Sequence, residues 1–501
     1  AITVVTKQQL EDTASIDIND VFRYEASTEG SGSYTPTVTD RGTAKDTVAG
    51  YSLGNDGSTT TNAQSNRVRG LGAPDAGTNF YATSSRIPFD SYNTQSIEIN
   101  RGPNSMLFGL GTPAGIVNQS TAQAAINKNT TNITLRTDSL GSARGSFAIN
   151  RTLIEDKLAI YVAALYDDRQ FQRRPSYDLY RRQYGALTFR PTKKTVIRGF
   201  AENYLNNANR PNFLTPRDFV TPWLQAGRPA YDLTTRMITK LDGGQTYGPY
   251  VSSSASPGYN PAAGTATGSL TKTTSPDYVP GILFESGARP IQRIDNGEAV
   301  DYFQRQLQFY RTVQTNPQAT VPTAGSLGWV AQDPRYTIYD RQWSGSNALP
   351  IPAATAFGPG YTYGSWQNPG ITNKSIYDWT KYNTLQSNFG HTKAQNYNVE
   401  LEQEILPNLF FSAGWFRQKI DSAENYSISQ TTGATVQIDT NTKLQNGSAN
   451  PYFGLPYLTD SAPDTFYLPE LNDNMRAMLA YELDFTKYNS WLKWFGRHRL
   501  L

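Results

Sequence analysis

Apolar and polar residues alternate with a period of two in several segments after about residue 131. Within Lys157–Asp168, for example, Ile160, Val162, Ala164 and Tyr166 fall on one face. This period is typical of half-buried β-strands with one apolar face, so these segments are predicted strands. Other segments with the same pattern include Gln183–Arg190, Thr195–Asn203, Gln395–Gln403, Leu409–Arg417 and Arg476–Thr486.

The connections between these strands alternate between short and long. Tight turns are predicted at Glu155-Asp156, Pro191–Lys194 and Pro407-Asn408, and long connections at Arg169–Leu179, about 207–388 and about 421–474. An antiparallel meander with tight turns at one end and long loops at the other is typical of an outer-membrane β-barrel. A soluble β-sandwich has no reason to separate its loops in this way. The pattern therefore favours a transmembrane barrel.

The apolar runs are too short for a transmembrane helix. The longest is Leu158–Tyr166, whereas a spanning helix needs roughly 20 residues and a spanning strand only about 9–11. Eight good strands are predicted, and Arg497–Leu501 begins a ninth, whereas a plugged transporter barrel has about 22. A barrel wall that stopped at Leu501 would leave an unpaired strand edge in lipid. We therefore expect the 501 residues to be a fragment of a longer chain.

Composition removes several kinds of function. The chain has no cysteine, which excludes thiolate zinc sites, disulfides and a cysteine nucleophile. Neither of its two histidines, His391 and His498, has a plausible nucleophile as partner in sequence, so no catalytic residue, metal site or cofactor is predicted. The net charge of +3 argues against nucleic-acid binding, which usually demands a basic surface. The carboxylates Asp167 and Asp168 end a strand and are expected to be solvated.

The N-terminal residues carry a different set of patterns. In Ile97–Ser120, IEINRGPNSMLFGLGTPAGIVNQS, an alternating strand runs into a turn so rich in Gly and Pro that only small residues fit. This segment closely resembles the plug-domain signature of TonB-dependent outer-membrane receptors. Three other segments resemble the elements that precede it in this family, in the same order: Ile2–Leu10, Asp17–Tyr24 and Asn66–Gly70.

The resemblance implies a mainly β protein, with an N-terminal mixed α/β plug domain inside an antiparallel transmembrane β-barrel. Residues 1–128 would form the plug, and residues 129–501 the first part of the barrel, with about nine of about 22 strands. The connections at about 207–388 and 421–474 would be extracellular loops. Ile2–Thr6 fits the first plug strand better than the short TonB-contacting box of the family, so that box is expected upstream of Ala1.

The resemblance also implies a role for two arginines. In the family, the plug arginines that match Arg69 and Arg101 form a charged cluster with glutamates of the inner barrel wall. Glu400 and Glu402 face the lumen if the apolar residues of Gln395–Gln403 face lipid, because side chains alternate along a strand, so they are the candidate partners. A buried guanidinium needs such a partner, since an unpaired buried charge is costly. The alternative is that both arginines only bond to turn carbonyls.

Two further groups of plug residues are singled out. The plug turn comprises Gly70, Gly102, Pro103, Gly109, Gly111 and Gly115. The spacing of its last three glycines, G-x-G-x-x-x-G, is not that of a dinucleotide-binding loop, and no βαβ unit follows. In the loop Ala73–Arg86, between two plug strands, the candidates for ligand contact are Asn79, Phe80, Tyr81 and Arg86. Packing of this loop on the barrel wall is the alternative.

The resemblance implies an outer-membrane receptor that imports a scarce solute, with energy from the inner-membrane TonB–ExbB–ExbD complex. The expected ligand is a siderophore, a cobalamin-like cofactor or an oligosaccharide, and the other expected partner is outer-membrane lipid. Such a protein would bind and gate, and would not be an enzyme. Two alternatives remain. One is a passive channel or surface-binding β-barrel without energised transport, which would have no plug. The other is a secreted carbohydrate-binding or hydrolytic protein, which would need inward apolar faces and, for hydrolysis, a close carboxylate pair.

Overall fold

The chain divides into two compact units in a computed structural model. The first comprises residues 1–212, 385–431 and 463–501, and the second comprises residues 213–384 and 432–462. The structure describes residues 2–29, 67–69, 74–84, 86–102, 114–211, 217–247 except 219, 226, 233 and 236, 282–286, 291–295, 298–303, 306–309, 371–426 except 372, 379 and 384–385, 435–459 except 445, and 464–500 except 488–489.

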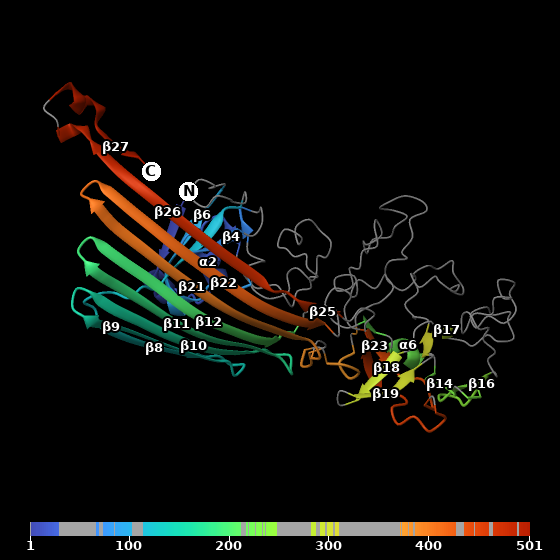
Figure 1. The fold of residues 1–501 in the computed structure, drawn as a ribbon. Coiled ribbons are helices and arrows are strands. Elements are labelled where there is room, and N and C mark those ends of the chain that lie inside the picture. The colour runs from blue at the N-terminus through green and yellow to red at the C-terminus, as the bar shows by residue number, and fades with distance from the viewer. Residues whose placement is uncertain are drawn as a thin grey trace, which may run out of the picture. The chain divides into compact units, whose positions relative to one another are not determined.

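The N-terminal part of the first unit is a mixed β-sheet. Five strands lie in the order β1-β6-β7-β4-β5 (Figure 1). Their bounds are β1 Ile2–Thr6, β4 Asp75–Thr78, β5 Tyr81–Ala82, β6 Thr94–Asn100 and β7 Ile116–Thr121. Strands β4 and β7 are parallel, and the other neighbours are antiparallel. The short strands β2 (Thr28–Glu29) and β3 (Arg67–Val68) pair separately. We call this sheet, with its helices, the N-terminal domain.

Two helices pack on this sheet, and each begins at a capping residue. Helix α1 (Lys7–Asp12) follows Thr6, which exchanges two hydrogen bonds with Gln9 in a capping box. Helix α2 (Ile18–Tyr24) follows Asp17, whose carboxylate accepts a backbone N–H of the first turn. The shared core contains Val5, Leu10, Ile18, Val21, Phe22, Val68, Phe89, Ile97, Ile99, Ala114 and Val117. None of the helices in the described part of the chain is long and apolar enough to cross a membrane.

A larger antiparallel sheet, which we call the wall, makes up the rest of the first unit. Among the described residues it has nine strands in sequence order: β8 Thr130–Thr137, β9 Ala143–Ile154, β10 Leu158–Gln170, β11 Tyr177–Thr192, β12 Thr195–Asn209, β21 Phe389–Leu406, β22 Leu409–Tyr426, β26 Glu470–Asp484 and β27 Arg497–Leu500. Strand β25 (Asp464–Tyr467) also pairs with β22. Strand β12 pairs directly with β21, so no described strand of the long connection lies between them in the wall.

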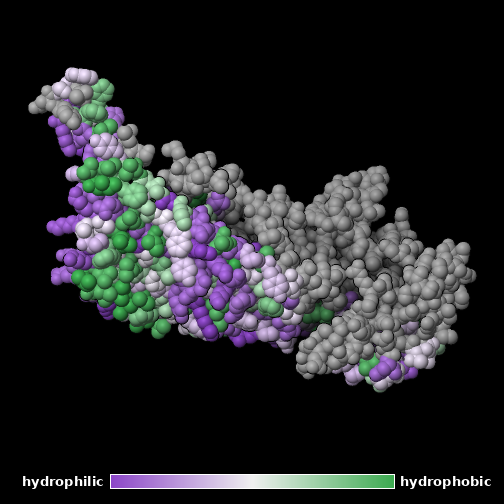
Figure 2. Space-filling model, viewed as in Figure 1, coloured by the Kyte–Doolittle hydropathy of each residue, from purple (hydrophilic) through white to green (hydrophobic). Residues whose placement is uncertain are grey.

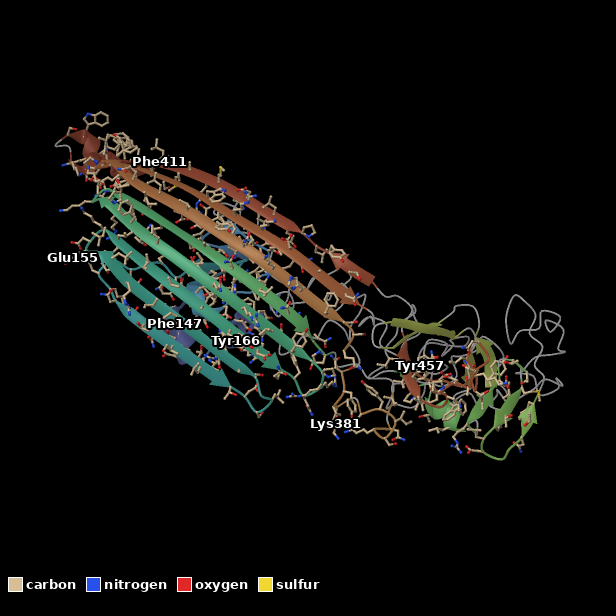
Figure 3. The ribbon with its side chains drawn as sticks, turned by 60° about the horizontal axis from the view of Figure 1, so that its bottom comes forward. Phe147, Glu155, Tyr166, Lys381, Phe411 and Tyr457 are labelled. Atoms are coloured by element: carbon tan, nitrogen blue, oxygen red, sulfur yellow. The ribbon has the colours of Figure 1, made fainter. Side chains whose placement is uncertain are left out.

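Side chains alternate across the wall as the sequence predicts. On β10 Tyr161 is buried and Tyr166 is exposed, and on β21 Asn398 is buried and Val399 is exposed. Phe147 on β9 lies on the same exposed face as Tyr166 (Figure 3), where Figure 2 shows hydrophobic side chains gathered. The wall therefore has an apolar outer face, while its inner face packs on the N-terminal domain. The prediction of a mainly β chain with an N-terminal mixed sheet and an antiparallel meander is confirmed.

Three tight turns lie at one end of the wall, as predicted. They join β9 to β10 after Ile154, β11 to β12 after Thr192, and β21 to β22 after Leu406. Glu155, in the first of these turns, and Phe411, near the start of β22, lie at this end in Figure 3. We call it the tight-turn end, and the opposite end the long-loop end.

The second unit is built from segments of both long connections. The first supplies β13 Arg217–Asp218, α6 Val220–Gln225, β14 Pro229–Tyr231, β15 Ile238–Lys240, β16 Thr246–Tyr247, β17 Ile282–Ser286, β18 Ile291–Asp295, β19 Glu298–Phe303 and β20 Gln306–Phe309; the second supplies β23 Thr435–Ile438 and β24 Pro456–Thr459. Strands β13 and β23 pair in parallel. Both connections also contribute to one core: Val220, Trp223, Tyr231, Ile238, Val436 and Ile438. The two connections therefore fold together.

Gly115 generates the first prediction. It has φ +103°, and an added Cβ would lie 1.9 Å from the carbonyl oxygen of Asn100. We expect Gly115→Ala to lower the free energy of opening of β6 and β7 by more than about 2 kcal/mol, because left-handed backbone and a backbone clash both oppose a side chain. Amide hydrogen exchange of the protein in detergent measures this. Gly185→Ala is the control, since a Cβ there meets no atom within 4 Å; equal exchange in the two variants would contradict the prediction.

Candidate functional site

The N-terminal domain meets the inner face of the wall through one short helical turn. The 3-10 helix η1 (Ser91–Asn93) follows Asp90, whose carboxylate accepts the backbone N–H of Tyr92 and so fixes the turn. Asp90, Tyr92, Asn93 and Thr94 are all buried. We call Asp90–Thr94 the anchor segment, because its polar side chains bond to several wall strands.

Arg144 on β9 joins the anchor segment to the wall through two carboxylates. Its guanidinium donates to Asp90 at 2.6 Å and to Asp167 on β10 at 2.7 Å. All three side chains are at most 7% exposed. Burial alone would raise the pKa of the Asp90 carboxyl, but the charge and hydrogen bonds of Arg144, the charge of Arg182 and the Tyr92 N–H together outweigh burial and hold this pKa below its ordinary value of 3.8. Asp90 is therefore ionised at neutral pH.

Asp167 corrects the prediction that this carboxylate is solvated. It is 3% exposed, because it faces inward on β10 and accepts bonds from both Arg144 and Arg169. The strand alternation alone would have given its direction, since Tyr161 and Leu165 face the same way and are buried.

Glu202 on β12 gathers a second group of bonds. Its carboxylate accepts from the Tyr92 hydroxyl at 2.6 Å, from Arg182 Nε at 3.0 Å and from Asn396 Nδ2 at 2.9 Å. The Arg182 guanidinium also lies 5.3 Å from the centroid of the Tyr92 ring. Burial, and next the Glu202 charge, raise the pKa of the Tyr92 hydroxyl well above its ordinary value, so this group remains a neutral donor. The anchor segment thus bonds to β12 and, through Glu202, to β11 and β21.

Tyrosines and alanines of the wall surround these ionic groups. The Tyr184 hydroxyl donates to the carbonyl of Ala122 at 2.7 Å, and the Tyr161 hydroxyl donates to that of Tyr92 at 3.4 Å. Small wall residues that pack in one hydrophobic cluster with these tyrosines, such as Ala163, leave room for the N-terminal domain to approach the wall closely. The interface is therefore close-packed but largely polar.

The hairpin of β4 and β5 makes a second contact with the wall. Tyr81 is buried, and its ring stacks on Phe416 of β22 with centroids 5.3 Å apart. The guanidinium of Arg476 on β26 lies 4.1 Å from the centroid of the same Tyr81 ring. Arg476 also pairs with Glu400 at 3.0 Å. An added Cβ at Gly414 would lie 2.1 Å from the Tyr81 hydroxyl oxygen, so the wall accommodates this ring only with glycine there.

The four candidates for ligand contact lie in or beside this hairpin. Asn79 bonds to Thr121 within the N-terminal domain, Tyr81 is buried against the wall, and Arg86 pairs with Glu470 at 2.5 Å. Phe80 is 38% exposed. These contacts favour the alternative in which the loop packs on the wall. Ligand contact stays a prediction, and Phe80 is the candidate with the most accessible ring.

The two arginines predicted to enter a charged cluster lie elsewhere. Arg101 donates to the Thr3 hydroxyl at 2.6 Å and lies 3.5 Å from the Glu25 carboxylate, so its partners belong to the N-terminal domain. Arg69 is exposed and has φ +56°, and its backbone N–H donates to the Ser27 carbonyl. Arg101 therefore ties β6 to β1 and to the end of α2.

Glu400 and Glu402 pair with arginines of the wall itself. Glu400 pairs with Arg476, and Glu402 pairs with Arg198 at 2.6 Å. Among the described residues, neither glutamate pairs with the N-terminal arginines that the sequence analysis proposed. The physical reason is the register of the strands. Glu402 lies diagonal to Arg198 on the adjacent strand β12, and Glu400 lies in line with Arg476 on β26, with Gly414 of β22 between them. The wall thus neutralises these two carboxylates without the N-terminal domain.

Two glycines of the predicted plug turn have left-handed backbone. Gly102 has φ +100° and Gly115 has φ +103°, a conformation that glycine adopts readily because it lacks a Cβ. The other residues of that turn, Gly70, Pro103, Gly109 and Gly111, lie outside the described residues.

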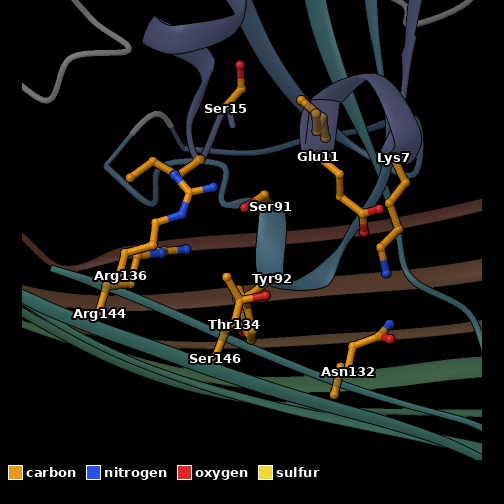
Figure 4. Close-up of a pocket in the computed structure, with 13 residues that line it drawn as sticks. Lys7, Glu11, Ser15, Ser91, Tyr92, Asn132, Thr134, Arg136, Arg144 and Ser146 are labelled. Atoms are coloured by element: carbon orange, nitrogen blue, oxygen red, sulfur yellow. The ribbon is translucent and has the colours of Figure 1, made fainter. Parts of the chain in front are cut away.

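A polar cavity of about 260 Å³ lies beside the anchor segment (Figure 4). It is lined by α1, by the anchor segment and by β8 and β9, with Lys7, Glu11, Arg136 and Arg144 as its charged groups. Arg136 donates to the carbonyl of Ala14 at 2.7 Å. At roughly 30 Å³ for each molecule, the cavity has room for several waters. This side of the interface is therefore less tightly packed than the anchor segment.

The sequence analysis missed the residues at the centre of the site. Glu202 lies on the inward face of the predicted strand Thr195–Asn203, where a charge must find a partner inside the protein, so its alternation carried that signal. Arg144 and Arg182 lie outside the segments predicted as strands. Alternation also could not identify the partners, because Glu202 meets Arg182 on the neighbouring strand and Tyr92 in the N-terminal domain.

Among the described residues, no group of three or more His, Cys, Asp or Glu side chains is placed to hold a metal ion. His391 Nδ1 lies 2.6 Å from the Asn207 side-chain oxygen, and His498 Nε2 lies 2.5 Å from the Phe495 carbonyl.

Comparison with known proteins identifies the N-terminal residues. Residues 1–116 match the family model of the TonB-dependent Receptor Plug Domain. No curated protein matches the chain. Solved structures that resemble it include BauA, the ferric preacinetobactin receptor from Acinetobacter baumannii, with 11% identity, 97% of this chain and 44% of that chain covered, and a TM-score of 0.43.

Two other solved structures give similar figures. The siderophore receptor PirA from Acinetobacter baumannii is 11% identical, with 97% of this chain and 46% of that chain covered and a TM-score of 0.40. The ferric-catecholate import receptor Fiu from E. coli K12 is 10% identical, with 96% and 66% covered and a TM-score of 0.32. The chain spans about half the length of the first two receptors. At these identities their solutes do not carry over to this chain.

Removal of one partner from the Glu202 group tests the anchor. We expect Arg182→Met to lower the free energy of opening of the anchor segment by about 3–5 kcal/mol, because it leaves the Glu202 carboxylate buried without its guanidinium. The double variant Arg182→Met/Glu202→Gln should lose less of this free energy, because it leaves no buried charge without a partner. Hydrogen exchange of the peptide containing Asp90–Thr94 measures both.

Arg198→Met is the matched control for this series. Its partner Glu402 is 53% exposed, so the loss should be at most about 1 kcal/mol. An Arg182 variant that behaves like the Arg198 variant would show that the buried group does not stabilise the contact.

The lowered pKa of Asp90 gives a dependence on pH. The unfolded chain binds a proton at Asp90 at higher pH than the folded protein, so this carboxylate stabilises the fold above its ordinary pKa of 3.8. The stabilisation is lost as pH falls through the lower folded value. We expect Asp90→Asn to be less stable than wild type at neutral pH, with the difference shrinking below about pH 4.

Urea unfolding of both proteins over a pH series measures this difference. Burial, and in smaller part the Asp90 charge, raise the pKa of Asp17, which gives the opposite pH dependence; both proteins therefore carry Asp17→Asn, so that this group does not titrate. A difference that stays constant on acidification would contradict the assignment of Asp90 as the ionised partner of Arg144.

Proposed function

Residues 1–116 are a TonB-dependent receptor plug domain, and on this basis we propose that the chain is part of a receptor that imports a scarce solute by TonB-energised movement of its plug. TonB-dependent receptors are transporters rather than enzymes, and they lie in the outer membrane, as the sequence predicts for this chain. The proposed partners are the TonB–ExbB–ExbD complex, the solute and outer-membrane lipid.

The buried polar contact of the anchor segment is the observation that carries this proposal. Asp90 and Tyr92 reach Arg144 and Glu202 on the wall through short hydrogen bonds between buried groups. Such contacts have a modest net stability, because forming them removes each group from water. A plug held in this way stays in place at rest. It can also move under a pulling force, because water can replace these hydrogen bonds as they break.

The outer face of the wall supports a position in the membrane. Leu135, Val162, Val399 and Met475 project from it, exposed, on β8, β10, β21 and β26. Apolar side chains in this position are stable in lipid and unfavourable in water. In such a wall the tight turns face the periplasm, and the long connections, which form the second unit, face the outside.

For the solute we propose a siderophore, a cobalamin-like cofactor or an oligosaccharide. The long connection at about 207–388 is rich in Trp and Tyr, and aromatic side chains can stack on the flat or ring-shaped faces that all three classes offer. The passive-channel alternative expects a chain without a plug, which does not fit the match of residues 1–116.

Uptake by cells that carry the full-length receptor tests the proposal. Cells with and without TonB receive labelled ferric siderophores, cobalamin and oligosaccharides in parallel. We expect one of these solutes to accumulate only when receptor and TonB are both present, and collapse of the proton gradient to abolish its uptake. A passive channel would instead give uptake without TonB, together with steady ion conductance in planar bilayers.

A further inference from the structure

The connection from β26 to β27 differs from the other connections at the tight-turn end. It runs over Phe485–Gly496, whereas its neighbours join strands through short turns. It belongs to the same end, because Tyr481 pairs with Leu409 at the start of β22, and Glu482 N–H donates to the Asn408 carbonyl at 2.8 Å. We call Phe485–Gly496 the aromatic turn. In Figure 1 it is the red segment beyond β26.

The described residues of the aromatic turn have a defined fold. Phe485 N–H donates to the Gly496 carbonyl at 3.0 Å, which closes the turn, and Gly496 has φ +69°. The Phe495 ring lies 6.0 Å from the Phe485 ring and 5.6 Å from the Trp491 ring, centroid to centroid. Two short helices, η4 (Phe485–Lys487) and η5 (Trp491–Phe495), carry these side chains.

Large aromatic side chains of the turn are nevertheless exposed. Trp491 is 69% exposed, Trp494 is 85% exposed and Phe495 is 53% exposed. Exposed apolar patches of this kind mark interaction surfaces. The patch continues the apolar outer face of the wall, because Leu479 and Tyr481 on β26 are also exposed and directly precede the turn.

The aromatic turn is also basic. Residues 484–500 contain four basic side chains, Lys487, Lys493, Arg497 and Arg499, against one acidic side chain, Asp484. Asp484 pairs with Arg497 at 3.1 Å and lies 3.8 Å from Lys487, whose side chain is 77% exposed. Glu482, just before the turn, also pairs with Arg497. Positive charge therefore remains beside the exposed tryptophans.

We propose that the aromatic turn binds the anionic phospholipid surface of the membrane at the tight-turn end of the wall. Trp491 and Trp494 lie in the interfacial region, which tryptophan favours because its ring is apolar and its N–H is a donor. Lys487 and Lys493 lie at the phosphate level, where basic residues gain from anionic headgroups. The continuity with the outer face of the wall favours lipid over a protein partner. The inference rests on the proposed function only in placing the wall in a membrane.

Site-specific labelling tests this, and the chain suits it because it has no cysteine. The variant Trp494→Cys carries a spin label in the aromatic turn. Met475→Cys, on the outer face of β26, is the lipid control, and Lys193→Cys, in the exposed turn between β11 and β12, is the water control. The full-length protein, with any cysteine outside these 501 residues replaced by serine, is reconstituted in vesicles of phosphatidylethanolamine and phosphatidylglycerol. Electron paramagnetic resonance then measures collisions of each label with oxygen, which concentrates in lipid, and with a water-soluble nickel chelate.

We expect the ratio of oxygen to nickel collisions at Trp494→Cys to be severalfold above that at Lys193→Cys and below that at Met475→Cys. Adding Lys487→Gln and Lys493→Gln, or replacing phosphatidylglycerol by phosphatidylcholine, should shift the ratio toward the water control. These results together support binding to anionic lipid.

Three results would overturn the proposal. A Trp494→Cys label as open to nickel as the water control, with Met475→Cys in lipid, rejects the aromatic turn as a lipid contact and leaves the proposed function intact. A label shielded from both reagents shows that protein covers the turn. A Met475→Cys label in water rejects the membrane position of the wall, and with it the proposed function.

Discussion

The buried ionic contact between the anchor segment and the wall is the constraint on which the arrangement of the first unit depends. Arg144, Arg182, Asp90 and Glu202 are removed from water, and each is stable there only while its partners remain in place. The bonds run from one short turn to strands β9, β10, β11, β12 and β21, directly or through Glu202. Because so many strands converge on one turn, these bonds specify how the N-terminal domain docks on the wall.

The same contact explains how a docked domain can also be movable. A purely apolar interface would resist separation through the exposure of its surface to water. Here hydroxyls, amides and charged groups form much of the interface, and water can replace their bonds as they break. The cavity bounded by α1, β8 and β9 shows that packing is already less tight on one side of the anchor segment. The hairpin of β4 and β5 is a contrasting contact, since Tyr81 stacks on Phe416 in a space that Gly414 leaves open.

The second unit shows how two long connections can be ordered without joining the wall. Their shared core combines Trp223 and Tyr231 of the first connection with Val436 and Ile438 of the second. The backbone of Tyr231 also bonds to Thr440 and Thr442 of the second connection. The two connections are therefore joined by apolar packing and by backbone hydrogen bonds.

The sequence by itself determined the strands, their faces and the tight turns. Alternation with a period of two is a local property, and so is the turn chemistry at Pro191–Lys194 and Pro407-Asn408. Four motifs together, Ile2–Leu10, Asp17–Tyr24, Asn66–Gly70 and Ile97–Ser120, predicted the plug domain whose family model matches residues 1–116. Alternation also gave the inward direction of Glu400 correctly. It gave no partner for that carboxylate, and the partner proposed for it, Arg101, instead lies beside Thr3 and Glu25.

Only the tertiary structure decided which charges meet. Glu400 pairs with Arg476, and Asp90 pairs with Arg144, through contacts between segments far apart in the sequence. Such pairs depend on the register of several strands at once and on how the N-terminal domain sits against them. Alternation fixes the face on which a side chain lies, but it says nothing about the height at which a distant strand brings its partner. Asp167 is buried because β10 continues past it to Gln170 and Arg144 meets its inward carboxylate, where the sequence suggested a strand end in solvent.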